Sequence, residues 1–102
     1  MANVYKNSKL DLTTTDVTTL YTCPAATTAV FKSILVSEDS GNADTVTATI
    51  TVGSTIFSLF KVKAVGANTT VELLTQPLVM NEAEILKFNA ATANRLHVVA
   101  SF

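Results

Sequence analysis

Residues 45–52, which read TVTATITV, alternate strictly between threonine and an apolar side chain. The apolar residues of this segment are Val46, Ala48, Ile50 and Val52. They point to one side of an extended chain, and the threonines point to the other. A period of two in β-branched residues predicts a β-strand with one buried face. A polar loop precedes the segment and Gly53 follows it, so we take this strand as the centre of the predicted fold.

The rest of the chain divides into similar extended segments separated by turn signals. We expect strands at residues 16–23, 28–37, 55–64, 69–74, 85–89 and 95–102, with a short apolar segment at 78–80. About eight short strands at intervals of roughly 8–12 residues, without a helical period, predict an all-β fold. The interpretation is one small antiparallel β-sandwich, jelly-roll-like because the Cys, Trp and Cys spacing of immunoglobulin domains is absent.

Residues 1–102 are predicted to form this single domain, since neither a linker nor an internal repeat divides them. Residues 1–15 alternate only weakly and end in a run of three threonines. They are interpreted either as an edge strand or as an arm whose partner is another subunit.

Two predicted strands, residues 28–37 and 55–64, carry apolar side chains on both faces. Residues 28–37 place Val30 and Ile34 on one face and Phe31 and Leu35 on the other. A strand of this kind is covered on both sides or lies at an interface. The residues predicted to form an interface between subunits are Phe31, Leu35, Phe57, Leu59 and Phe102.

Composition supports an oligomer. Hydrophobic residues make up 48% of the chain and charged residues only 15%, below the usual quarter. A domain this small has little interior in which to bury apolar groups, so part of this surface is expected to face a neighbour.

Charge argues against two classes of partner. Seven basic and eight acidic residues nearly cancel and form no run, so neither nucleic acid nor a membrane is an expected partner. The N-terminus does not resemble a signal peptide, and no apolar run reaches the roughly 20 residues that span a bilayer. The lone Cys23 cannot form an internal disulfide, which fits synthesis in a reducing cytoplasm.

Residues with catalytic potential are few. His97 is the only histidine, and no nucleophile-elbow motif accompanies it, so a surface or interface role is expected. Cys23 follows a predicted strand without a basic neighbour in sequence, and is interpreted as a small apolar plug. One histidine and one cysteine cannot supply a zinc site.

Two acidic segments were weighed as sites. Residues 38–44 contain three carboxylates and a glycine, the oxygen-rich composition of a Ca²⁺ loop, but they lack its ligand spacing. The preferred interpretation is a solvated hairpin. Glu82 and Glu84 lie in a predicted turn without a basic partner in sequence, so a turn is favoured over an acid–base pair. No catalytic, cofactor-binding or metal site is therefore predicted.

Several segments together resemble short virion-associated proteins of tailed bacteriophages, best known from marine and cyanobacterial phages. They are ANVYKN, then TLYTCPAATTAVFKSILVSEDSGNADTVTATITV, and finally QPLVMNEAEILKF with NRLHVVASF. The similarity covers most of the chain, but it consists of strands and turns rather than chemistry. Many members of this group carry Gly-Asp in the penultimate turn, where this chain has Ala83 and Glu84.

The resemblance implies a non-enzymatic structural protein of the virion, assembled in the host cytoplasm. The preferred hypothesis is a capsid decoration or cement protein that forms a homo-oligomer, guessed to be a trimer, on the major capsid protein. One alternative is a neck, tail-fibre or baseplate component. Another is a glycan- or receptor-binding β-sandwich, with Tyr5 and Tyr21 as the only plausible stacking residues. A hydrolase that depends on His97 is the remaining alternative.

Overall fold

The structure is a computed structural model that describes residues 6–102, and over that range it contains strands and turns but no helix. The strands are β1 (Asn7–Leu12), β2 (Thr18–Thr22), β3 (Ala29–Phe31), β4 (Ser33–Glu38), β5 (Asp44–Val52), β6 (Thr55–Val65), β7 (Thr70–Glu72), β8 (Leu78–Met80), β9 (Ile85–Ala90) and β10 (Leu96–Ser101). The prediction of an all-β chain is confirmed, with ten strands in place of about eight.

Strand pairing follows one rule, in which strands equally far from the two ends of the chain are partners. β1 pairs with β10, β2 with β9, β3 with β8, β4 with β7, and β5 with β6, all antiparallel. The chain is therefore one long antiparallel ribbon that doubles back at the β5–β6 hairpin.

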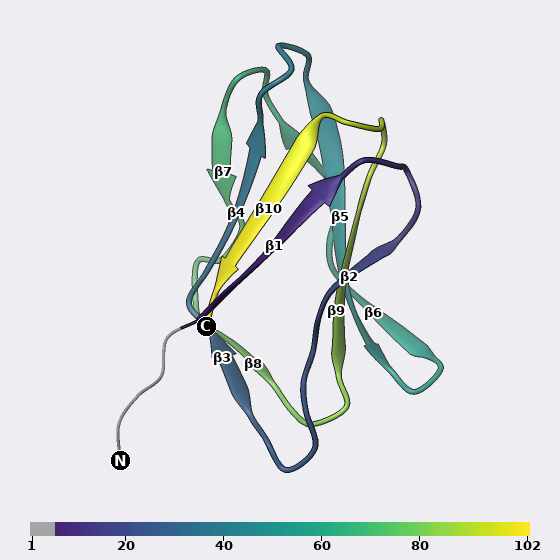
Figure 1. Cartoon of the computed structure of the whole chain (residues 1–102), viewed down its shortest axis with the longest axis vertical. Helices are drawn as coiled ribbons and strands as arrows, with labels where there is room; N and C mark the ends of the chain where they lie inside the picture. The colour runs from purple at the N-terminus through teal and green to yellow at the C-terminus, as the bar shows by residue number, and fades with distance from the viewer. Residues whose placement is uncertain (1–5) are drawn as a thin grey trace.

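Two further pairings roll this ribbon up. β10 bonds to β4, and β5 bonds to β9. The result is a sheet of order β1-β10-β4-β7 facing a sheet of order β2-β9-β5-β6, with β3 and β8 as a separate two-stranded ribbon at the lower end of Figure 1. A doubled ribbon rolled into two four-stranded sheets is a jelly roll, as the sequence predicted.

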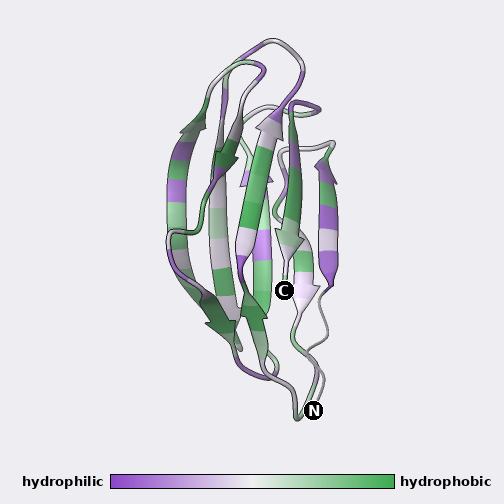
Figure 2. Cartoon of the chain, turned by 90° about the vertical axis from the view of Figure 1, so that its left-hand side faces the viewer, coloured by the Kyte–Doolittle hydropathy of each residue, from purple (hydrophilic) through white to green (hydrophobic). Residues whose placement is uncertain are grey.

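The core lies between the two sheets, and the alternation of residues 45–52 accounts for its centre. Val46, Ala48 and Ile50 of β5 are buried, while Val52 at the strand end is exposed. The same alternation of apolar and polar positions along the strands is visible in Figure 2. Other large, fully buried side chains are Leu12, Phe31, Ile34, Val36, Val65, Met80, Leu86, Phe88, Leu96 and Val98.

The prediction of one continuous strand over residues 28–37 was wrong. The chain leaves β3 and enters β4 at Lys32, whose backbone N–H donates to the carbonyl of Ser101 at 2.8 Å. Because of this break, Phe31 and Ile34 both point into the core although they are three residues apart. The expected face that joins Phe31 to Leu35 therefore does not exist.

The N-terminal segment is an edge strand of the chain's own sheet. β1 pairs with β10 over its whole length, and Lys6 and Phe102 extend this pairing through hydrogen bonds of 2.6 and 2.8 Å. For residues 6–15, the edge-strand interpretation replaces the arm that reaches another subunit. Residues 1–5, and with them Tyr5, lie outside the described part of the chain.

β6 is the longest strand and the outermost strand of its sheet. Its register with β5 shifts between Val46 and Thr49. Near this irregularity Val62 adopts a φ of 54° and donates its N–H to the hydroxyl of Thr47 at 3.1 Å. A left-handed conformation is strongly disfavoured for a β-branched residue. The backbone of β6 is therefore irregular at Val62, at an energetic cost.

This strain gives a first testable prediction. We expect Val62→Gly to raise the free energy of unfolding by about 1 kcal/mol, because glycine adopts a positive φ without a Cβ clash. Val62 is 60% exposed, so little packing is lost. Urea denaturation measures the change. The control is Val79→Gly, at an exposed position of β8 that lacks a positive φ, where we expect destabilisation; equal effects at the two positions would contradict the prediction.

Candidate interaction surface

The five residues predicted to form an interface fall in three separate places. Phe31 and Phe102 belong to one aromatic cluster, Leu35 lies on the outer face of β4, and Phe57 and Leu59 lie on β6. The fold does not gather them into one surface.

The aromatic cluster consists of Tyr21, Phe31 and Phe102. Their ring centroids are 4.6 to 5.4 Å apart, and the Tyr21 and Phe31 rings meet edge to face. Burial raises the pKa of the Tyr21 hydroxyl. Phe102 at the end of the chain is thereby fixed against its own domain.

Phe31 must be removed from the candidate interface. Its side chain is fully buried inside the domain and has no surface to offer a second subunit. The reason is the break at Lys32, which turns Phe31 toward the core. Phe102 is only partly exposed, since the same cluster covers it.

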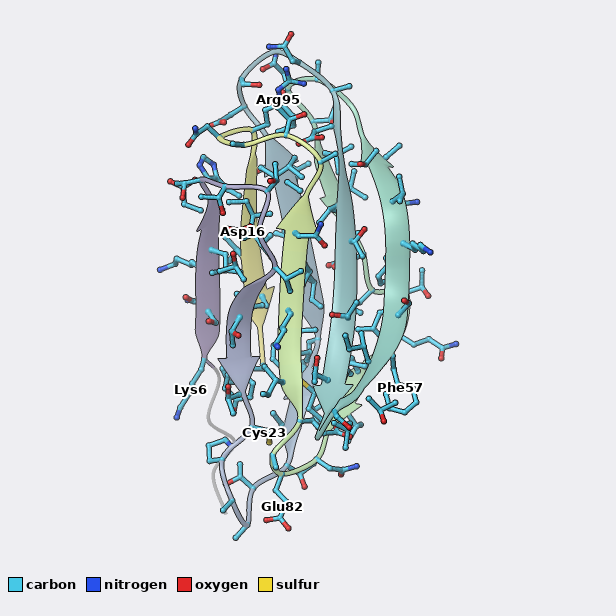
Figure 3. The ribbon with its side chains drawn as sticks, turned by 90° about the vertical axis from the view of Figure 1, so that its right-hand side faces the viewer. Lys6, Asp16, Cys23, Phe57, Glu82 and Arg95 are labelled. Carbon is cyan, nitrogen blue, oxygen red and sulfur yellow. The ribbon has the colours of Figure 1, made fainter. Side chains whose placement is uncertain are left out.

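β6 carries the most prominent exposed apolar side chains. Phe57 is 54% exposed and Ile56 is 65% exposed, and Val52 of the adjoining strand end is exposed as well. Figure 3 shows Phe57 on the outermost strand, pointing away from the rest of the sheet. Leu59 is half-buried. Residues 55–64 had been interpreted as apolar on both faces, and exposure of both Ile56 and Phe57 fits that pattern.

Other exposed apolar residues are dispersed. Leu35, 39% exposed, lies opposite Val99 and Glu72 on the neighbouring strands. Val30 and Val79 face each other across the β3–β8 ribbon, and both are exposed. Sequence reasoning missed this pair, because it needs the β3–β8 pairing between segments about fifty residues apart.

A shallow hollow of about 230 Å³ lies between β6 and the segment that links β7 to β8. Its apolar lining is Leu59, Phe60, Leu73, Leu74, Pro77 and Leu78. It marks the open edge of the sandwich, where the short strand β7 does not cover the inner face of the much longer β6. The apolar surface of β6 thus continues toward the core.

His97 lies in a row of polar residues across three neighbouring strands. Asp11 is its partner on β1 and Ser37 its partner on β4. The ring Nε2 is 3.3 Å from the Asp11 carboxylate, and Nδ1 is 3.5 Å from that of Asp39. Both ring nitrogens therefore face carboxylates, and neither is placed to accept a proton from Ser37. Sequence analysis expected a surface or interface histidine and did not anticipate these two carboxylates.

Cys23 is buried, as predicted, and its thiol contacts the carbonyls of Thr27 and Met80 at 3.4 and 3.7 Å. Glu82 and Glu84 do not act as a pair. Glu82 accepts a hydrogen bond from the Ala26 N–H at 2.6 Å, whereas Glu84 accepts one from the Asn81 N–H at 2.7 Å. Each carboxylate thus stabilises a turn.

In the acidic loop of residues 38–44, Glu38 and Asp44 accept hydrogen bonds from groups of the chain itself. Glu38 is buried and accepts hydrogen bonds from the Ser40 N–H and hydroxyl and from the N–H groups of Gly41 and Asn68. Burial raises the pKa of Glu38, but these four hydrogen bonds outweigh it and lower the value to about 2. Asp44 likewise accepts from the N–H groups of Thr45 and Thr92.

Between residues 6 and 102, no three His, Cys, Asp or Glu side chains are placed to hold a metal ion. In the same range, no helix is present that is long and apolar enough to cross a bilayer. The geometry defines a jelly-roll β-sandwich with an exposed apolar strand at one edge. A scan of protein-family models and searches of curated proteins and of solved structures found no match to the chain.

Proposed function

We propose that the protein is a non-enzymatic structural component of a tailed-phage virion, a decoration or cement protein bound to the major capsid protein. The observation that carries this proposal is the exposure of apolar side chains on both faces of the β6 edge, Phe57 with the neighbouring Val52 on one face and Ile56 on the other. The segments quoted above, which resemble virion-associated proteins, indicate that the assembly in which these side chains become covered is a virion.

The fold is compatible with this function but does not select it. Jelly rolls occur in viral capsid proteins and also in lectins and cupins, and one fold hosts many functions. The energetic argument is more direct. Covering about 300 Å² of exposed apolar side chain in an assembly stabilises it by roughly 7 kcal/mol at 25 cal/mol per Å², before the cost of association.

The alternatives differ in how much the structure supports them. A neck, tail-fibre or baseplate protein also needs an apolar contact surface, so β6 is equally compatible with that location. A glycan-binding role has less support, because the ring of Tyr21 packs against Phe31 and Phe102 instead of standing free for stacking. The hydrolase alternative has less support, because within residues 6–102 the groups placed against the ring nitrogens of His97 are the carboxylates of Asp11 and Asp39.

Quantitative mass spectrometry of purified particles of the phage that encodes this chain tests the proposal. Capsids and tails are separated before the measurement. We expect the chain in the capsid fraction, at a fixed ratio to the major capsid protein. Recovery only with tails would move the protein to the appendage, and absence from both fractions would reject a virion role.

A further inference from the structure

β6 is one of the four edge strands of the two large sheets. β5 is its only strand partner among residues 6–102, so one row of β6 backbone N–H and C=O groups faces outward. Unpaired strand edges bind further strands, and proteins commonly block them with lysines, bulges or bends.

β6 is blocked over only half of its length. The second half contains Lys61, Lys63 and the strained Val62, next to the register shift. The first half, residues 55–60, contains no charged residue and pairs regularly with β5 from Thr55 to Ser58, before a bulge leaves Leu59 without a partner on β5. It also carries the exposed Ile56 and Phe57. This uncharged half of β6 therefore has free backbone N–H and C=O groups, exposed apolar side chains and no charge, and pairing with a further strand requires all three.

The uncharged half is complementary to a second copy of itself. Successive residues of a strand turn their backbone groups to opposite edges, so two identical antiparallel strands must centre on a residue and not between two residues. Centring on Phe57 places Phe57 opposite Phe57 and Ile56 opposite Ser58, within the part of the strand that pairs regularly with β5.

Electrostatic repulsion favours the register centred on Phe57 over registers centred on residues nearer to Lys61. With Phe57 at the centre, the two copies of Lys61 are eight residues apart, which is about 27 Å and well beyond the Debye length of about 8 Å in physiological salt. Each shift of the centre toward Lys61 brings the lysines closer, until they face each other directly. Like charges directly opposite one another destabilise a strand pair.

We propose that two copies of this chain associate through antiparallel pairing of residues 56–58 of β6, with Phe57 on the two-fold axis. The two four-stranded sheets that contain β6 then form one continuous sheet, and the Phe57 rings cover each other. This inference rests on the β6 edge alone and holds wherever the protein is located. A two-fold contact builds dimers, so a trimer needs a different surface.

Sedimentation of the purified full-length chain tests the inference. We expect a concentration-dependent monomer–dimer equilibrium for the wild type, and a dissociation constant about 100-fold higher for Phe57→Lys, which places two like charges opposite each other. The matched control is Val79→Lys. Val79 and Phe57 are both 54% exposed, but Val79 lies on β8, so the control should dimerise like the wild type.

Cysteine cross-linking tests the register independently of affinity. A residue on the axis of an antiparallel pair lies about 5 Å from its own copy, within reach of a disulfide. Under mild oxidation we expect Phe57→Cys to form a linked dimer and Lys61→Cys to remain unlinked. Cys23 is buried and should not interfere.

Three results would overturn the proposal. One is a wild-type chain that stays monomeric up to its solubility limit, which would leave the β6 edge for a strand of another protein. A second is a dimer that survives Phe57→Lys while the protein remains folded by circular dichroism. A third is equal cross-linking through positions 57 and 61.

Discussion

Replacing Phe31 by alanine is expected to lower the free energy of unfolding by about 3–5 kcal/mol. The ring is fully buried, stands 4.7 Å from that of Phe102 and meets that of Tyr21 edge to face at 5.4 Å. Its removal costs transfer free energy, leaves a cavity and breaks two aromatic contacts. Urea denaturation followed by circular dichroism measures the change.

The matched variant is Phe57→Ala, which removes the same atoms from a side chain that is 54% exposed. We expect the unfolding free energy of the monomer to change by less than about 0.5 kcal/mol. The pair of variants separates a core phenylalanine from a surface one. Similar losses at both positions would mean that Phe57 is also a core residue, and would remove the basis for a β6 interface.

Glu38→Gln is expected to cause the second-largest loss of stability. One oxygen of the carboxylate accepts two hydrogen bonds from Ser40. The other oxygen accepts hydrogen bonds from the N–H groups of Gly41 and Asn68. The amide of glutamine has only one oxygen, so its NH₂ group faces one of these two pairs of donors. The donors of that pair then have no acceptor. We expect the melting temperature to fall by about 10 °C. The exposed Glu82 accepts a hydrogen bond from the Ala26 N–H, so Glu82→Gln, at an exposed position, is the mild control.

The same residue makes stability depend on pH in acid. The pKa of Glu38 falls from 4.5 to about 2 in the folded chain. Its contribution is therefore complete above pH 4.5 and is lost as the pH falls toward 2, because the unfolded chain binds a proton that the folded chain does not. Between pH 4.5 and pH 2, the free energy of unfolding of the wild type should therefore fall more steeply with decreasing pH than that of Glu38→Gln. The difference between the two slopes corresponds to nearly one bound proton. Parallel pH profiles would contradict this account.

Local sequence patterns were sufficient for the strands and for the class of fold. The threonine and apolar alternation of residues 45–52 predicted β5, and regular turn signals predicted a small β-sandwich. These inferences succeed because a period of two is a property of neighbouring residues and needs no partner. The burial of Cys23 was predicted from another local feature, its place at a strand end without a basic neighbour in sequence.

Contacts between segments that are far apart in the chain could not be predicted from the sequence pattern. The acidic loop was read as a solvated hairpin, yet Glu38 is buried and bound by the N–H of Asn68. His97 lies between Asp11 and Asp39, which are far from it in the chain. Both arrangements depend on pairings across the rolled ribbon, and no local period encodes these.

The sequence by itself determined that this chain forms strands, where most of them lie, and that it carries more apolar surface than a small domain readily buries. Only the tertiary structure decided which apolar residues remain exposed. A break at Lys32 turned Phe31 inward, and the edge position of β6 left Phe57 outside. Alternation assigns a side chain to a face of its strand, but whether that face is covered depends on which strands lie opposite it.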